Sequence, residues 1–505
     1  MVISIIMNNK QPLMTVIKIK NNGIYIYIFV PSFLAGQKLD GKLVVLEEDE
    51  RQKQDNLIKY QPLAGKHAVQ MSPAAGLQAP LLPSSKTEKR PSVSGAVFNV
   101  ATSIIGAGIM SIPATIKVLG VIPAFVLIVI IACLTDISVD FLMRYTNAGE
   151  TSTYAGVMRE SFGRAGSVAV QLCVMITNLG CLIIFLIIIG DVLCGKQPEG
   201  SVHLGVLQEW FGFHWWNTRV FALLFVMVFV MLPLALFRRV GSLRFSSAIS
   251  VLLAVIFVAI CSVMAIYAVW EGKSKTPKLL PQLDNHVSVF DLFTAVPVIV
   301  TAFTFHFNVH PIGFEFDKPS DMITAVRISL VICAAIYFSV GLFGYLLFGE
   351  SIMSDILINF DQSSGSAISS LLNDLVRLSY ALHLMLVFPM LNFSLRANID
   401  ELLFSQKPLL AKDTKRFLSI TLVLLVFSYT AAITIPDIWY FFQFLGSTSA
   451  VCLAFIFPGV IVLRDVHGIS TTRDRIIATV MIVLAVVTST IAISTNIYSS
   501  IRNKS

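Results

Sequence analysis

Long apolar runs follow one another through most of this chain, with short polar connections between them. From residue 94 onward, eleven runs reach about 20 residues, the length that an α-helix needs to cross the hydrocarbon core of a bilayer. The runs cover residues 94–118, 121–144, 167–193, 219–236, 246–270, 290–312, 322–348, 372–395, 416–435, 438–463 and 475–498. This pattern predicts an all-α membrane protein with eleven transmembrane helices.

The first and sixth runs are interrupted where a transmembrane helix should be most regular. The first carries Gly106-Ala107-Gly108 near its middle, and the sixth carries His306 with Pro311 shortly after it. Backbone that leaves the helix at membrane depth is tolerated only where protein or a polar cavity satisfies its N–H and C=O groups. Breaks in runs one and six predict a 5+5 inverted repeat that holds a polar ligand at the midplane. The alternative is that these glycines and prolines only kink two ordinary membrane helices.

The domain organisation follows from the same pattern. Residues 1–93 are polar and mixed in composition, so we expect a mostly disordered cytoplasmic tail. A second start at Met71 is an alternative, in which case residues 1–70 are an extension. We expect the two five-helix repeats at residues 94–270 and 290–463, and the eleventh helix at residues 475–498.

Composition and charge support the membrane interpretation. Of the 505 residues, 55% are hydrophobic and 13% are charged, and the mean hydropathy is +0.78. Soluble domains carry roughly 25% charged residues. The net charge of +7 does not indicate nucleic acid as a partner, because Lys and Arg gather at the ends of the runs. The expected partner of the apolar surface is the lipid bilayer.

The positions of the basic residues also predict an orientation. Lys86, Lys89 and Arg90 precede the first run, whereas residues 349–370, on the opposite side, contain no Lys or Arg. Because cytoplasmic loops carry an excess of Lys and Arg, the N-terminus is expected in the cytoplasm. The lysines within residues 273–278 are an exception to this pattern.

Four segments together resemble a known family. They are FNVATSIIGAGIMSIP at residues 98–113, YAGVMRESFGRAG at 154–166, IIIGDVL at 187–193 and FHFNVHPIGFEF at 305–316. The likeness is to the amino acid/auxin permease family, and within it to sodium-coupled neutral amino-acid transporters and to plant vacuolar amino-acid transporter-like proteins. The resemblance covers about residues 92–496. It implies a LeuT-like fold and secondary active transport of neutral amino acids across a vacuolar or plasma membrane.

The two breaks indicate where an amino acid would bind. Backbone N–H groups at the start of a half-helix can receive the α-carboxylate, and glycine allows close approach. Carbonyl groups freed near the two breaks can receive the α-ammonium, and phenylalanines of the sixth run can shape an apolar pocket, although aromatic residues in membrane helices often only pack. The predicted substrate-binding residues are Thr102, Ile105, Gly106, Ala107, Gly108, Ile109, Phe303, Phe305, His306 and Phe307.

The coupling ion is predicted to be a proton. Compared with sodium-coupled relatives, this chain has Thr102 where an asparagine is usual and Met385 where a threonine is usual. A hard cation takes about six oxygen ligands, and a thioether supplies none. Sodium is therefore the alternative, with Thr102 as a hydroxyl ligand.

A proton needs a titratable group within the spans, where such groups are costly and usually functional. The candidates are His306, Asp136, Asp191 and His383, and His306 is favoured because it lies at the second break. Asp136 and Asp140 share one helical face, so a structural role for both, in pairing with Arg144, is the alternative.

No enzymatic or cofactor chemistry is indicated. His306 and His310 share a face but have no third ligand in the sequence nearby, so no metal site is expected. No GxSxG or HExxH motif lies on any run. The sequence thus predicts a proton-coupled transporter of neutral amino acids that alternates access around a midplane site. The alternatives are a sodium-coupled transporter and an amino-acid-binding sensor, or transceptor, that signals through its tail.

Overall fold

The computed structural model describes residues 14–21, 24–31, 93–195, 203–238, 244–281, 289–313, 319–360, 367–404, 407–408, 410–435 and 438–502. The chain divides into two units, Met1–Gln70 and Met71–Ser505. In the first unit, strands β1 (Met14–Asn21) and β2 (Ile24–Pro31) pair as an antiparallel hairpin. Both strands are rich in β-branched or aromatic residues, and β2 consists of them up to its final proline, which favours strands within the tail expected to be mostly disordered. The remainder of that tail, including Met71, lies outside the described residues.

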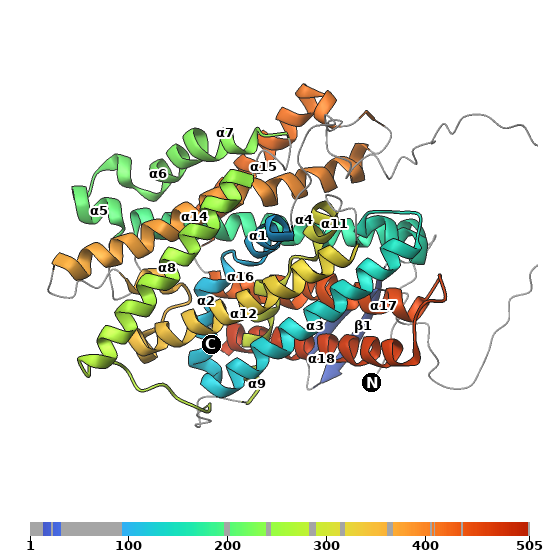
Figure 1. Cartoon of the computed structure of the whole chain (residues 1–505), viewed down its shortest axis with the longest axis horizontal. Helices are drawn as coiled ribbons and strands as arrows, with labels where there is room; N and C mark the ends of the chain where they lie inside the picture. Colours follow the sequence, from blue (N-terminus) through green and yellow to red (C-terminus); the bar gives the residue numbers. More distant parts are fainter. Residues whose placement is uncertain are drawn as a thin grey trace, which may run out of the picture. The chain divides into compact units, whose positions relative to one another are not determined.

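The second unit is helical, and its helices follow the predicted runs (Figure 1). The first half contains α1 (Val93–Ile104), α2 (Gly108–Leu119), α3 (Val121–Ala148), α4 (Tyr154–Cys194), α5 (Val206–Phe211), α6 (Arg219–Val226), α7 (Leu232–Ala235) and α8 (Arg244–Trp270). The second half contains α9 (Val289–Leu292), α10 (Ala295–Phe303), α11 (His306–Gly313), α12 (Pro319–Phe348), α13 (Ile356–Asn359), α14 (Ala367–Phe404), α15 (Thr414–Thr434), α16 (Ile438–Leu445), α17 (Phe457–Arg464) and α18 (Thr472–Arg502). Short π-helical turns occur at Met227–Met231, Gly446–Ala450 and Cys452–Ile456.

The number of spans is roughly consistent with the expected eleven. Within the described residues, nine helices are long and apolar enough to cross a membrane, and the bent pair Gly95–Ile104 and Gly108–Leu119 makes a tenth. The remaining run, Arg219–Ala235, is apolar and helical but shorter than the others. Every predicted run is therefore helical, while length alone supports nine or ten spans.

The broken helices lie at the centre of the helical unit. In the most apolar 18-residue stretch of Ala295–Gly313, 89% is buried inside the protein, whereas the share is 28% in Thr472–Tyr498. The helix pair α1 and α2 packs against α12, α10 packs against α2 and α16, and α14 packs against α4 and α8. The outer helices carry exposed apolar side chains suited to lipid, and the inner helices surround the two breaks.

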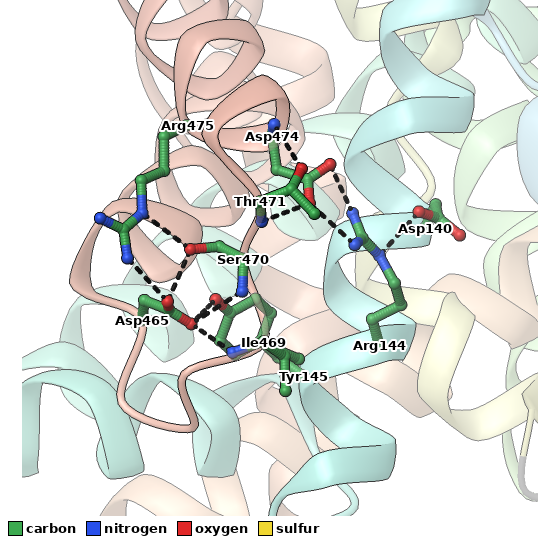
Figure 2. Close-up of polar contacts among 9 residues, drawn as sticks. All are labelled: Asp140, Arg144, Tyr145, Asp465, Ile469, Ser470, Thr471, Asp474 and Arg475. Atoms are coloured by element: carbon green, nitrogen blue, oxygen red, sulfur yellow. Dashed lines mark hydrogen bonds and ion pairs between the residues drawn. The ribbon is translucent and has the colours of Figure 1, made fainter.

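A polar cluster at one end of the bundle fixes α18 and the turn before it against α3 (Figure 2). Arg144 donates to both carboxylate oxygens of Asp474, at 3.1 and 3.2 Å. Asp465 accepts from Tyr145 Oη at 2.6 Å, from Arg475 at 2.9 Å and from the Ser470 hydroxyl at 2.6 Å. Burial favours the neutral acid, but the hydrogen bonds from Ser470, Tyr145 and Arg475 outweigh it and lower the pKa of Asp465 below its usual range.

The lowered pKa of Asp465 predicts a pH-dependent stability. Because the carboxylate is favoured in the folded state, its contribution is present above the unfolded pKa of about 3.9 and is lost as the pH falls through the lower folded value. We expect Asp465→Asn to reduce the free energy of unfolding at neutral pH by on the order of 1 kcal/mol, since the cluster is partly exposed. Thermal unfolding of the detergent-solubilised protein, followed by fluorescence at several pH values, measures the change.

The two proteins should converge in stability as the pH falls from about 4 towards the lower folded pKa of Asp465, because the unfolded chain takes up a proton at this carboxylate before the folded chain does. Glu150→Gln is the matched control, because the Glu150 carboxylate makes no hydrogen bond or ion pair within the described part of the chain. Equal stability of Asp465→Asn and wild type at neutral pH would contradict the assignment.

Candidate functional site

The first helix breaks between Ile104 and Gly108, where α1 and α2 meet at an angle of 57°. Three successive carbonyl oxygens at this break contact polar side chains of other helices. Tyr337 Oη donates to Ile104 at 2.6 Å, and Tyr380 Oη donates to Gly106 at 2.6 Å. The Ile105 oxygen lies 3.1 Å from the Nε2 atom of His383. The break is thus supported by α12 and α14, as a break inside a membrane requires.

The second break separates α10 from α11 at Thr304 and Phe305. The Thr304 hydroxyl donates to the Val300 oxygen at 2.6 Å, and the Thr304 N–H donates to Thr301 at 3.2 Å. The Ala302 oxygen lies 2.9 Å from Tyr337 Oη. Tyr337 therefore contacts a backbone carbonyl of each break and holds the two together.

The two breaks approach each other at Gly108. A Cβ atom added at Gly108 would lie 2.6 Å from the Ala302 Cβ and 2.7 Å from its Cα. Contacts under 3.0 Å are essentially never made by real Cβ atoms. Only glycine at this position allows α2 to start directly against the end of α10.

A cavity of about 40 Å³ lies between the two breaks. Apolar side chains from three other helices complete its walls: Cys181 and Phe185 from α4, Val387 and Leu391 from α14, and Phe442 from α16. The broken helices contribute Thr102, Ser103, Ile104, Gly106, Ala107, Gly108, Thr301, Ala302, Thr304 and Phe307. Among the described residues, no Asp, Glu, Lys, Arg or His side chain lines this cavity.

Helix ends supply the charge that the side chains lack. The start of α2 has no side-chain cap at Ala107, so its first N–H groups carry a partial positive charge beside the cavity. The C-terminal ends of α1 and α10 direct carbonyl groups to the same region and carry a partial negative charge. The buried Thr102 hydroxyl has no hydrogen-bond partner within the described residues and lines the cavity. Opposite partial charges at the helix ends suit the two charged groups of a small zwitterion, and the cavity must widen to admit one.

The structure brings half of the predicted substrate residues to this cavity. Those that line it are Thr102, Gly106, Ala107, Gly108 and Phe307. The others, namely Ile105, Ile109, Phe303, Phe305 and His306, are buried next to it without lining it.

Two of the predicted phenylalanines pack on neighbouring rings instead. The ring of Phe303 lies 5.1 Å from that of Tyr337, and the ring of Phe305 lies 5.6 Å from that of His306. The packing interpretation of aromatic residues therefore describes these two, whereas Phe307 contributes to the cavity wall.

The histidines of α11 face α3 and not the cavity. His306 Nε2 lies 2.7 Å from the Ser138 hydroxyl, which itself donates to the Thr135 oxygen at 3.0 Å. His310 Nε2 lies 2.9 Å from the Thr146 hydroxyl in a similar arrangement. A neutral imidazole satisfies each of these contacts. In the described part of the chain, no group of three His, Cys, Asp or Glu side chains is placed to bind a metal.

The predicted acidic candidates are engaged in ion pairs. Asp140 pairs with Arg144 at 2.9 Å, as expected from their spacing. Asp136 does not pair with Arg144: it lies 3.2 Å from Arg327 of α12, while Asp474 takes the other side of Arg144. The packing of α12 against α3, which the spacing along one helix does not reveal, accounts for this correction.

Asp191 is the third acidic candidate. It is 4% exposed and forms an ion pair with Arg219 of α6. This pair joins α4 to α6 and does not line the cavity.

Several residues of the site were not expected from the sequence. Tyr337 and Tyr380 support the first break, and Phe185, Leu391 and Phe442 close the cavity. The tyrosines carried a usable signal, because a phenol at mid-span needs a hydrogen-bond partner. The apolar wall residues carried no such signal, because a single sequence does not distinguish them from residues of the hydrophobic core.

Comparisons with known proteins agree with this architecture. Residues 89–501 match the family described as "Transmembrane amino acid transporter protein". Amino acid transporter AVT6C of Arabidopsis thaliana is 65% identical over 421 residues, which cover 83% of this chain and 97% of the relative. Sodium-coupled neutral amino acid transporter 7 of Danio rerio is 29% identical over 416 residues, covering 80% of this chain and 86% of the relative.

A solved structure, the Eremococcus coleocola manganese transporter in complex with an aromatic bis-isothiourea substituted compound, matches with a TM-score of 0.52. It covers 82% of this chain and 89% of that chain at 13% identity, so the likeness concerns the fold alone, which is the predicted LeuT-like class. Because the family match extends over most of the sequence, this chain belongs to the transmembrane amino acid transporter family and is a multi-pass membrane protein.

Proposed function

We propose that this protein is a secondary active transporter of neutral amino acids and that protons drive it. The observation that carries the substrate class is the cavity at the two breaks, which combines charged helix ends with no charged side chain among the described residues. The helix ends suit an α-carboxylate and an α-ammonium, which all amino acids share. The apolar walls favour a side chain without charge, because a buried unpaired charge is costly.

The arrangement of the breaks supports alternating access around this cavity. Each half-helix is joined to its partner by only two or three non-helical residues, so it can tilt with little loss of backbone hydrogen bonds. Tyr337 contacts both breaks, and Gly108 lies directly against Ala302. Movement of α2 and α10 is thus linked, and it opens or closes the cavity as a unit.

The oxygen atoms near the cavity favour a proton over sodium. The side chains of this lining supply four hydroxyl oxygens, those of Thr102, Ser103, Thr301 and Thr304. The last three donate to backbone carbonyls and keep oxygen lone pairs, and the Thr102 hydroxyl has no partner among the described residues. Met385 is buried on α14 and does not line the cavity. A sodium ion requires about six oxygen ligands, more than this lining offers without rearrangement.

We also propose that the N-terminus and the polar cluster of Figure 2 face the cytoplasm, in a vacuolar or plasma membrane. Arg144 and Arg475 of that cluster lie on the side where the chain places its excess of basic residues. Cytoplasmic loops of membrane proteins carry such an excess.

Reconstituted protein provides the direct test of substrate and ion. We expect purified protein in liposomes to accumulate neutral amino acids from a mixed radiolabelled panel when a pH gradient is imposed. Lysine and glutamate should accumulate at least about tenfold less, because each adds a charge that the cavity does not pair. Liposomes without protein, and a sodium gradient at constant pH, are the controls.

Two results would contradict the proposal in different ways. Uptake driven only by the sodium gradient would replace the proton by sodium and keep the substrate class. Absence of uptake under either gradient, together with binding of an amino acid to the intact protein, would favour the sensor function instead.

The close approach at Gly108 predicts a graded pair of variants. We expect Gly108→Ala to lower uptake at least about tenfold, because the added methyl overlaps the Ala302 backbone and overpacking costs about 1–3 kcal/mol. Gly313→Ala is the matched control, since Gly313 does not line the cavity and its Cβ would make ordinary contacts with Met143 and Met322, at 3.6 and 3.7 Å. Initial uptake rates, normalised to the protein incorporated, measure both. Equal activity of the two variants would show that the contact at Gly108 does not limit transport.

A further inference from the structure

His383 is a buried ionisable side chain at the meeting point of three helices. It lies on α14 and is fully buried. Its Nδ1 atom is 2.7 Å from the carbonyl oxygen of Ser250 on α8, and its Nε2 atom is 3.1 Å from the carbonyl oxygen of Ile105 at the first break. Both neighbours are backbone carbonyls, which accept hydrogen bonds and cannot donate them.

Only a protonated ring satisfies both carbonyls. A neutral imidazole has a single N–H group, so it donates to one oxygen and turns a nitrogen lone pair towards the other. The imidazolium has two N–H groups and donates to both. His306 differs in this respect, because its partner Ser138 is a hydroxyl that a neutral ring can satisfy.

The surroundings offset part of the cost of a buried positive charge. The carbonyls of Ile104, Ile105 and Gly106 form the C-terminal end of α1, where the helix dipole favours a cation. The ring of Tyr380 lies 4.8 Å from the imidazole and adds an electron-rich face. Within the described residues, no acidic or basic side chain makes a hydrogen bond or ion pair with His383.

The other titratable groups near this junction are two phenols, the Asp355 carboxyl group and the Cys181 thiol of the cavity lining. Tyr380 is on the same helix and donates to Gly106, and Tyr337 of α12 donates to Ile104. Helix α1 contains no ionisable side chain, and α8 contains only Arg244, Cys261 and Tyr267, each at least six residues from Ser250. Asp355, which caps α13 through the Leu357 N–H group, acts electrostatically on Tyr380.

We propose that His383 binds the coupled proton and that the bound proton locks α14 to α8 and to the first break at the same time. The inference rests on the proposed function. When the proton leaves to water, one of the two contacts is lost. Ile105 lies between Ile104 and Gly106, which line the cavity, so release of its carbonyl changes the backbone at the substrate site. Proton binding and amino-acid binding thereby act on the same turn of chain.

The test compares His383→Gln with His306→Gln in proteoliposomes, using the neutral amino acid that the wild type transports best. We expect the pH gradient to drive at least about tenfold less accumulation in His383→Gln than in the wild type. The variant should still exchange unlabelled amino acid inside the liposome for labelled amino acid outside. Its exchange rate should no longer vary between about pH 5 and 8. His306→Gln should keep both the accumulation and the pH profile of the wild type.

The outcomes separate this inference from the proposed function. If His383→Gln accumulates amino acid as the wild type does and follows the same pH profile, His383 is not the proton site. If the wild type itself transports amino acid without any response to a pH gradient, proton coupling fails, and with it the role of His383.

A spectroscopic measurement on the wild type covers the case in which His383→Gln does not fold. Nitrogen-15 spectra of histidine-labelled protein distinguish doubly protonated from neutral imidazole rings. We expect one solvent-protected ring to be doubly protonated on the acidic side of the transport profile. Solvent-protected rings that are all neutral at every pH at which the protein transports would overturn the assignment.

Discussion

Unpaired backbone at the break of the first helix is the constraint on which the rest of this structure depends. Water is excluded from the membrane interior, so each carbonyl that leaves the helical pattern must find a partner in the protein. Ile104, Ile105 and Gly106 find theirs in Tyr337, His383 and Tyr380. Helices α12 and α14 must therefore lie where these side chains can reach the break, and that requirement sets the packing around the cavity.

The second break is placed by contact with the first. Gly108 lies against Ala302 with no room for a side chain, and Tyr337 contacts a carbonyl on each side. With backbone at the centre and apolar side chains from α4, α14 and α16 around it, the cavity presents helix ends as its only sources of charge among the described residues. The proposed selection for an uncharged side chain rests on the absence of charged side chains from the described walls.

The sequence was sufficient for the features that depend on run length and on breaks in periodicity. The positions of the helices and both interruptions could be predicted. An apolar run near 20 residues matches the thickness of a bilayer, mid-run glycines weaken the first helix, and His306 and Pro311 interrupt the apolar pattern of the sixth run. Contacts between helices could not be predicted from the sequence. Asp136 pairs with Arg327, and His306 contacts Ser138. Both contacts depend on how α3, α11 and α12 cross, which the sequence does not reveal. A histidine at a break is equally compatible with the cavity and with a neighbouring helix until the crossing is known.

In the proposed mechanism, the three carbonyls of the first break place substrate and proton on one turn of backbone. Ile104 and Gly106 line the cavity, and Ile105 between them contacts His383. A change at the middle residue is transmitted to its neighbours through rigid peptide planes and needs no longer pathway. Coupling between two ligands is reciprocal, so a proton that alters amino-acid affinity must have its own affinity altered by the same factor. Because no charged side chain lines the described cavity, this shared turn is the connection by which, as proposed, a proton gradient acts on a neutral substrate.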